Sequence, residues 1–115
     1  MADLAQRGAP GQKDPKPICG TAKGFRHMGR VKALPCVICL RHGPSDAHHC
    51  QSSGYKGDPG KMARDDFKTI PLCKECHQGQ QGYHNAKETW EAKNGKDHEF
   101  LAVVADMLAG QWVRP

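Results

Sequence analysis

Two cysteine pairs constrain the fold of this 115-residue chain more than any other feature. Each pair has the spacing C-x-x-C, and together they comprise Cys36, Cys39, Cys73 and Cys76. Two thiolates spaced in this way occupy two corners of a tetrahedron, so two such pairs complete the four-ligand set that Zn²⁺ prefers. All four corners are then filled by protein, which leaves no open position for chemistry. The spacing therefore predicts a structural zinc site whose binding energy contributes to folding.

The composition also favours metal binding over disulfides. Hydrophobic residues make up only 37% of the chain, and a small domain with little apolar core commonly needs a metal or a crosslink. The first residues contain no apolar secretory signal, so we expect a cytoplasmic protein with reduced thiols. The sequence also has no apolar run long enough to span a membrane, so we expect no membrane partner. Of the two remaining cysteines, Cys19 is expected to be a spare thiol and Cys50 a small buried residue.

Local patterns predict an α+β fold. Residues 1–24 are rich in Gly, Pro, Lys and Asp and are expected to form a flexible basic tail before a folded domain at 25–112. Residues 46–50 and 67–72 are expected to form two antiparallel strands. Four helices are expected: a short one before Pro35, one that begins at Cys73, one over 85–95 with Asn85 as its N-cap, and one over 98–110 with an apolar face.

Two adjacent histidines lie on the first expected strand. Neighbouring strand residues face opposite sides, so His48 and His49 cannot perform the same task. We expect His48 to bind a divalent metal together with His77, which leaves open positions for a phosphate oxygen and water. His49 is then a candidate general base, because its ordinary pKa of about 6.5 suits proton abstraction at neutral pH.

His84 is a third candidate ligand for this metal. It lies seven residues after His77, which is about 10.5 Å of rise along a regular helix. It therefore reaches the metal only if the GQQG segment at 79–82 ends the helix and folds the chain back, which the two glycines permit. The other three histidines, His27, His42 and His98, are expected on the surface.

The formal net charge of +5 favours a polyanionic partner, with nucleic acid first. The turn-rich segment 51–66 and the strand after it carry four candidate DNA-contacting residues: Lys56, Lys61, Arg64 and Lys68. The basic run from Lys23 to Lys32 is either a phosphate-contacting surface or a solvated face.

Together, the motifs CVIC, AHHC and TIPLCKECHQGQQGYHNAKETWE resemble the HNH endonuclease family, and in particular small phage and prophage nucleases of the recombination-enhancement, RecA-dependent type. The resemblance covers about residues 30 to 108. It implies a small zinc-stapled treble clef or ββα-metal finger that hydrolyses DNA in a bacterial host cell. It implies Mg²⁺ or another divalent metal on His48 and His77, with His49 as the base. A recombinase filament is a further candidate partner.

The chain departs from the HNH pattern at one position. The middle asparagine of that pattern corresponds to Lys68, which cannot accept a hydrogen bond and so cannot orient His49. The base must then be held by another group, such as a backbone carbonyl, and Lys68 is free to contact phosphate. Two alternatives stay open: a zinc-stapled module that binds nucleic acid or a recombination protein without cleavage, and a structural treble-clef adaptor.

Overall fold

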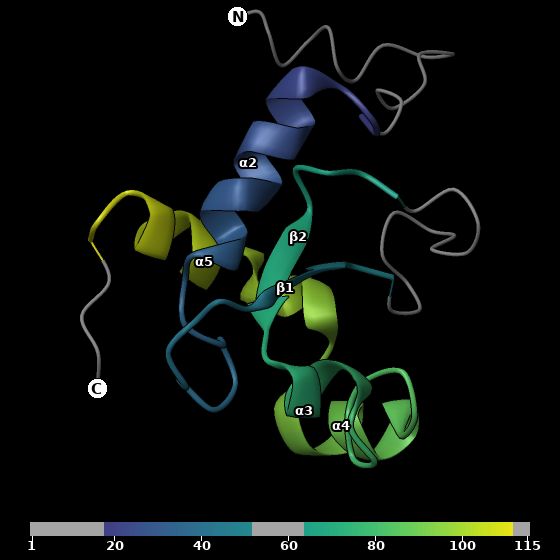
Figure 1. Cartoon of the computed structure of the whole chain (residues 1–115). Coiled ribbons are helices and arrows are strands. Elements are labelled where there is room, and N and C mark those ends of the chain that lie inside the picture. The colour runs from purple at the N-terminus through teal and green to yellow at the C-terminus, as the bar shows by residue number, and fades with distance from the viewer. Residues whose placement is uncertain (1–17, 52–63, 112–115) are drawn as a thin grey trace, which may run out of the picture.

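The computed structural model describes residues 18–51 and 64–111, which Figure 1 draws in colour. These residues form a two-stranded sheet, four α-helices and one 3-10 helix. In chain order the elements are α2 Ala22–Lys32, β1 Asp46–His49, β2 Thr69–Leu72, α3 Lys74–Gln78, α4 Lys87–Asn94, η1 Asp97–Phe100 and α5 Leu101–Leu108. The expected α+β class is confirmed. Within the described ranges, no helix has the length and apolar character needed to cross a membrane.

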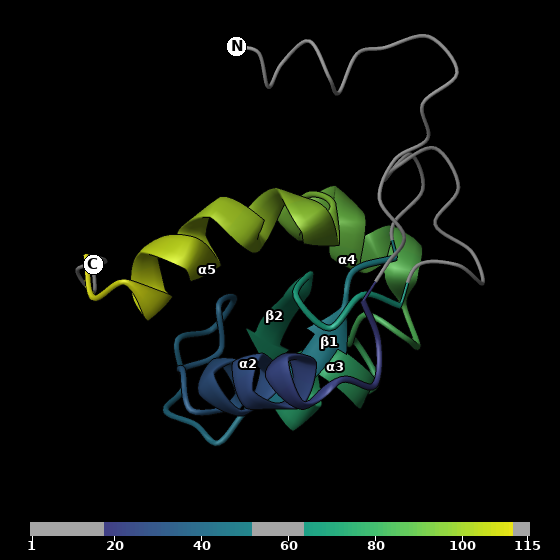
Figure 2. The same ribbon diagram turned by 90° about the horizontal axis from the view of Figure 1, so that it is seen from above.

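The two strands are antiparallel, as expected, and pair Asp46 with Leu72 and His49 with Thr69. They are one and two residues shorter than the expected ranges. Every residue of β2 is buried, because the sheet lies between α2 on one side and α5 on the other (Figure 2). Alternation along β1 buries His48 and leaves His49 partly exposed, so the pleat separates the two rings.

The hydrophobic core joins all of these layers. Its buried side chains include Val31 from α2, Ile70 from β2, Trp90 from α4 and Val104 from α5. The apolar stripe expected over 98–110 does pack inward, although its first turn is the 3-10 helix η1. The two helices that cover the sheet thus fix the strand from which both adjacent histidines project.

The folded domain begins before the expected boundary at residue 24. Helix α2 starts at Ala22, where the Thr21 side chain accepts a hydrogen bond from the Gly24 N–H at 2.9 Å. Upstream of it, the Ile18 carbonyl accepts a hydrogen bond from the backbone N–H of Asp66 at 2.7 Å. Residues 18–24 therefore belong to the fold, and the rest of the expected tail, 1–17, lies outside the described residues.

The expected N-cap at Asn85 is wrong. Helix α4 begins at Lys87 after Ala86, with no side-chain cap. The Asn85 side chain instead donates hydrogen bonds to the carbonyls of Gln78 and Gly79, at 2.8 and 3.0 Å. These carbonyls end α3, so Asn85 closes the preceding helix because the chain folds back onto it. Gly95 ends α4 as expected, with a φ of 97° that favours glycine.

Candidate metal centres

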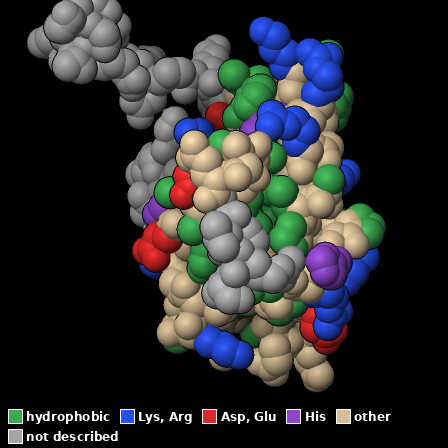
Figure 3. Space-filling view, turned by 90° about the vertical axis from the view of Figure 1, so that its left-hand side faces the viewer, with side chains coloured by type: hydrophobic (Ala, Val, Ile, Leu, Met, Phe, Trp, Pro, Cys, Tyr) green, Lys and Arg blue, Asp and Glu red, His purple; other side chains and the backbone are tan. Residues whose placement is uncertain are grey.

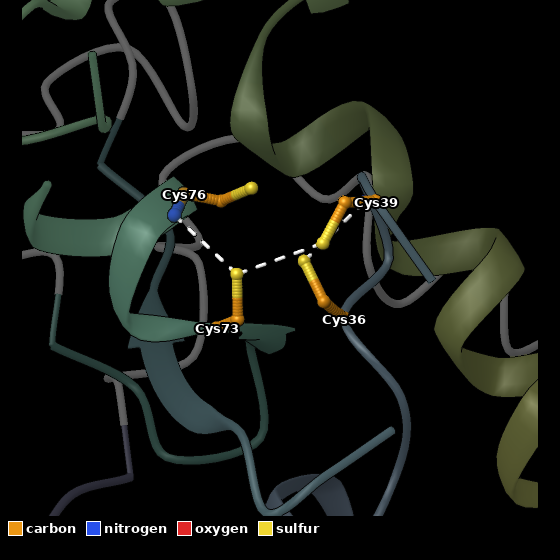
Figure 4. Close-up of side chains that lie close together, drawn as sticks. All are labelled: Cys36, Cys39, Cys73 and Cys76. Atoms are coloured by element: carbon orange, nitrogen blue, oxygen red, sulfur yellow. Dashed lines mark hydrogen bonds between the residues drawn. The ribbon is translucent and has the colours of Figure 1, made fainter. Parts of the chain in front are cut away.

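The four cysteines of the C-x-x-C pairs converge, and their sulfur atoms all lie within 4.8 Å of one another (Figure 4). The Sγ atoms of Cys39 and Cys73 are 3.6 Å apart, far longer than a disulfide bond. Tetrahedral zinc with Zn–S bonds of about 2.3 Å requires S···S distances of about 3.8 Å. The cluster therefore has the size of a zinc site.

Backbone amides support the sulfur atoms in both pairs. The Cys39 N–H donates to Cys36 Sγ, and the Cys76 N–H donates to Cys73 Sγ, both at 3.5 Å. Burial alone would raise the pKa of Cys73, but the hydrogen bond from the Cys76 N–H and those from neighbouring thiols bring it below its ordinary value. Burial raises the pKa of Cys76 instead. A bound zinc ion would stabilise all four sulfur atoms as thiolates.

A second cluster brings together His48, His77 and His84, which offer nitrogen atoms within 4.8 Å of one another. His48 comes from β1, His77 from α3 and His84 from the turn that follows α3. The Nε2 atoms of His77 and His84 are 3.1 Å apart. The structure thus brings together the three histidines that the sequence suggested as metal ligands, and His84 reaches the other two because of this turn.

The GQQG segment folds back as the sequence allowed. Helix α3 ends at Gln78, and the His84 N–H donates to the His77 carbonyl at 3.1 Å. A Cβ atom on Gly82 would lie 2.7 Å from the Glu75 carbonyl oxygen, and one on Gly79 would lie 2.6 Å from it. These contacts are too short for any other residue, so both glycines are needed for close backbone approach.

Carboxylates hold two of the three rings. His48 Nε2 lies 2.8 Å from Asp97 Oδ2, with both side chains fully buried. His77 Nδ1 lies 2.8 Å from Asp46 Oδ2. A carboxylate only accepts, so one N–H of each ring donates a hydrogen bond to the acid, and the lone pair on the other ring nitrogen faces the cluster. Carboxylate–histidine pairs of this kind orient the ligands of many metal sites.

The residues of the histidine cluster fit a metal ion. His48 Nδ1 is buried and has no hydrogen-bond partner among the described residues, which is costly unless a cation binds it. Burial lowers the pKa of His48 despite the opposing effect of Asp97. Partial desolvation by its surroundings, together with the neighbouring rings of His48 and His77, also lowers the pKa of His84, although this residue is exposed at the surface. Both rings are therefore neutral at pH 7, the form that binds metals.

His49 projects from the other side of β1 and has a carboxylate partner of its own. Its Nε2 lies 2.9 Å from Oδ1 of Asp66, a residue that is 1% exposed. Burial alone would raise the pKa of Asp66, but the hydrogen bonds from His49 and from the Gly20 N–H bring it below its ordinary value. The sequence interpretation missed Asp66 and proposed a backbone carbonyl. Its only signal in the sequence was its place directly before the strand expected over 67–72.

The family model described as "Protein of unknown function (DUF968)" matches residues 12–109, a range that contains both clusters. The chain belongs to the DUF968 family. No curated protein and no solved structure matches it.

The candidate DNA-contacting residues of this DUF968 chain occupy different settings. Arg64 is exposed, whereas Lys68 is half-buried beside His27 and Phe67. The carbonyl of Lys68 accepts a hydrogen bond from the Cys50 N–H at 3.0 Å. Lys68 thus lies at the end of the strand pair and lines a small cavity of about 180 Å³ between α2 and α5. Lys56 and Lys61 lie outside the described residues.

The remaining cysteines and histidines stay outside both clusters. Cys50 is fully buried, as expected, and Cys19 is exposed. His42 is exposed, and the other two histidines expected on the surface are partly exposed. His27 is partly buried against Phe67, with ring centroids 4.9 Å apart, and His98 is partly buried with its Nδ1 3.8 Å from Asp97 Oδ1. Contacts with neighbouring residues cover part of each of these two rings.

Proposed function

We propose that this protein is a metal-dependent endonuclease that hydrolyses DNA phosphodiester bonds. One observation carries the proposal: β1 presents a ligand of a three-histidine cluster and, at the next position, a histidine held by a different carboxylate. A purely structural domain needs neither of these arrangements beside its four-cysteine cluster. The resemblance to HNH nucleases gives the same roles to His48, His49 and His77.

The three-histidine cluster supports a transition metal at this position. His48 is buried and His77 half-buried, while His84 is exposed, so the cluster is open to solvent on the His84 side. Imidazoles suit Zn²⁺, Ni²⁺ and related ions, whereas Mg²⁺ prefers oxygen ligands. We therefore favour a transition metal over Mg²⁺ at this site. Three protein ligands leave a coordination position free, as in catalytic sites.

In this proposal the side chains divide the work of hydrolysis. The bound cation supplies a Lewis acid that stabilises charge on the phosphate and on the leaving oxygen. His49 accepts the proton of the attacking water through the nitrogen that does not face Asp66. Asp97 and Asp46 keep His48 and His77 aimed at the cluster. Basic residues supply affinity that does not depend on sequence.

A plasmid-nicking assay with Mg²⁺, Mn²⁺, Co²⁺, Ni²⁺ and Zn²⁺ tests the proposal. His49→Ala is expected to lower the rate of nicking by about a hundredfold or more, which is the range of general-base catalysis, and to leave DNA affinity unchanged. His77→Ala is expected to lose both nicking and one bound metal ion per chain. His42→Ala, an exposed histidine outside both clusters, is the matched control. A parent protein that nicks DNA with none of these metals would refute the proposal.

A zinc-stapled DNA-binding module without catalysis is the second candidate function. The 3.1 Å distance between His77 and His84 favours it, since a direct N–H···N hydrogen bond also accounts for this contact. Metal analysis separates the two candidates. A nuclease is expected to bind two ions per chain, one on sulfur and one on imidazole, whereas the module binds only the first.

A further inference from the structure

We propose that Asp66 is the residue that positions His49 as a general base, in the role for which the chain has no asparagine. This inference rests on the proposed function, in which His49 accepts a proton from the attacking water, and it specifies which ring nitrogen of His49 does so. Asp66 does not contact the three-histidine cluster in any described interaction, so it acts through His49 alone.

The hydrogen bond between the two residues decides the tautomer of His49. His49 Nε2 lies 2.9 Å from Asp66 Oδ1, and a carboxylate can only accept. The proton of a neutral His49 ring therefore resides on Nε2. Its lone pair resides on Nδ1, on the opposite edge of the ring, and this is the atom that can take a proton from water.

Three further contacts hold Asp66 in place. Its Oδ2 accepts a hydrogen bond from the Gly20 N–H at 2.9 Å. Its backbone N–H donates to the Ile18 carbonyl, and its own carbonyl accepts from the Thr69 hydroxyl at 3.2 Å. Because Thr69 pairs with His49 across the sheet, the strand pair fixes both partners of the hydrogen bond. The acid is thus held from the entry to α2 and from β2.

The Asp66 carboxylate packs against helix α2 at Gly24, where the missing side chain leaves room for it. A Cβ atom on Gly24 would lie 2.7 Å from Asp66 Oδ2 and 2.9 Å from Asp66 Cβ. Any side chain at position 24 would therefore push the carboxylate away from His49. A Cβ atom on Gly29, in the same helix, would have nothing within 4 Å, so this residue offers a matched comparison.

Asp66→Asn turns this geometry into a test. The amide has one acceptor, and the Gly20 N–H requires it, so the amide NH₂ must face His49 Nε2. Nε2 would then accept a hydrogen bond, and the proton of His49 would move to Nδ1, which removes the lone pair needed for catalysis. The shape of the side chain is unchanged, so the fold and zinc content are expected to be retained.

The experiment compares the zinc-loaded parent, Asp66→Asn and Asp65→Asn. Asp65 is the matched control, because its Oδ1 accepts from the Phe67 N–H and an asparagine can do the same. Long-range ¹H–¹⁵N NMR spectra of the histidine rings report the tautomer of His49, and single-turnover nicking reports the rate. We expect Nε2–H in the parent and control, Nδ1–H in Asp66→Asn, and a rate loss of about a hundredfold or more in that variant only.

The outcomes separate this inference from the proposed function. A tautomer switch in a protein whose parent nicks no DNA supports the role of Asp66 and contradicts hydrolysis. An unchanged tautomer in Asp66→Asn overturns the role of Asp66, whatever the rate does. Gly24→Ala provides a second variant, expected to weaken the same hydrogen bond and lower the rate while Gly29→Ala leaves both unchanged. Equal rates in these two glycine variants would also contradict the inference.

Discussion

At the scale of single residues, Cys73 gives the sharpest test of the sulfur cluster. It is buried, its Sγ contacts Cys39, and the same atom caps α3 by accepting from the Cys76 N–H. Serine is itself a good N-cap but a poor zinc ligand, so Cys73→Ser removes the metal and keeps the cap. We expect loss of bound zinc and destabilisation by about 4 kcal/mol or more, measured by metal analysis and thermal melting.

The matched control for this variant is Cys19→Ser, because Cys19 is exposed and outside both clusters. We expect its stability to stay within about 0.5 kcal/mol of the parent. A Cys73→Ser protein that retains its zinc and melts like Cys19→Ser would show that the sulfur cluster is not a zinc site.

The spacing of ligands along the chain predicted more of the site than any other signal did. The C-x-x-C pairs identified the four cysteines that the structure brings together, and strand alternation placed His48 and His49 on different faces. The carboxylates behind the rings were not predictable. Asp97 lies 49 residues from His48 and Asp66 lies 17 residues from His49 in sequence, and no local pattern marks pairs that only the tertiary fold creates.

At the scale of elements, the turn after α3 determines whether His84 can join His48 and His77. A Cβ atom on Gly82 would meet the Glu75 carbonyl at 2.7 Å and the Gly79 nitrogen at 2.8 Å, so Gly82→Ala must open the turn. We expect this variant to lose the metal ion proposed at the three-histidine cluster while it keeps metal at the four-cysteine cluster. Its free energy of unfolding is expected to fall by about 1–3 kcal/mol.

Gly29→Ala is the control for Gly82→Ala, and the metal stoichiometry and thermal melting of the two variants are compared. Gly29 lies inside α2 with open space around it, so alanine there is expected to stabilise the protein by about 0.5–1 kcal/mol. If Gly82→Ala binds two ions as tightly as the parent, the turn does not position His84.

Helix ends show where sequence rules for elements failed. The capping-box pattern favoured Asn85 because Glu88 follows three residues later. In the structure Asn85 bonds the carbonyls that end α3, since the fold-back brings those unpaired acceptors within its reach. Thr21, by contrast, caps α2 by the usual rule and was overlooked because the preceding residues resembled a tail. Local capping preference decides the outcome only where tertiary contacts offer no competing partner.

At the scale of the whole molecule, the net charge of +5 includes a helix that carries only basic charges. Helix α2 contains Lys23, Arg26 and Arg30 at helical spacing and no acidic residue. Figure 3 shows several Lys and Arg side chains at the upper end of the molecule, the end where α2 lies in Figure 1, and others toward its lower end. Arg30 also donates a hydrogen bond to the Leu108 carbonyl at 3.4 Å, so it links α2 to α5. Lys23 and Arg26 are thus the better probes of a phosphate-contacting face.

Arg26→Gln and Lys93→Gln each remove one positive charge from an exposed helix position, but only the first lies on α2. If DNA runs along α2, Arg26→Gln weakens DNA binding and reduces the slope of log affinity against log salt by about one, whereas Lys93→Gln changes neither. Fluorescence anisotropy with a labelled duplex over a range of salt concentrations measures both quantities. Equal losses in the two variants would mean that overall charge, and not this helix, sets the affinity. Because α2 packs at Gly24 against Asp66, DNA bound along this helix would lie close to the carboxylate that bonds His49, the proposed general base.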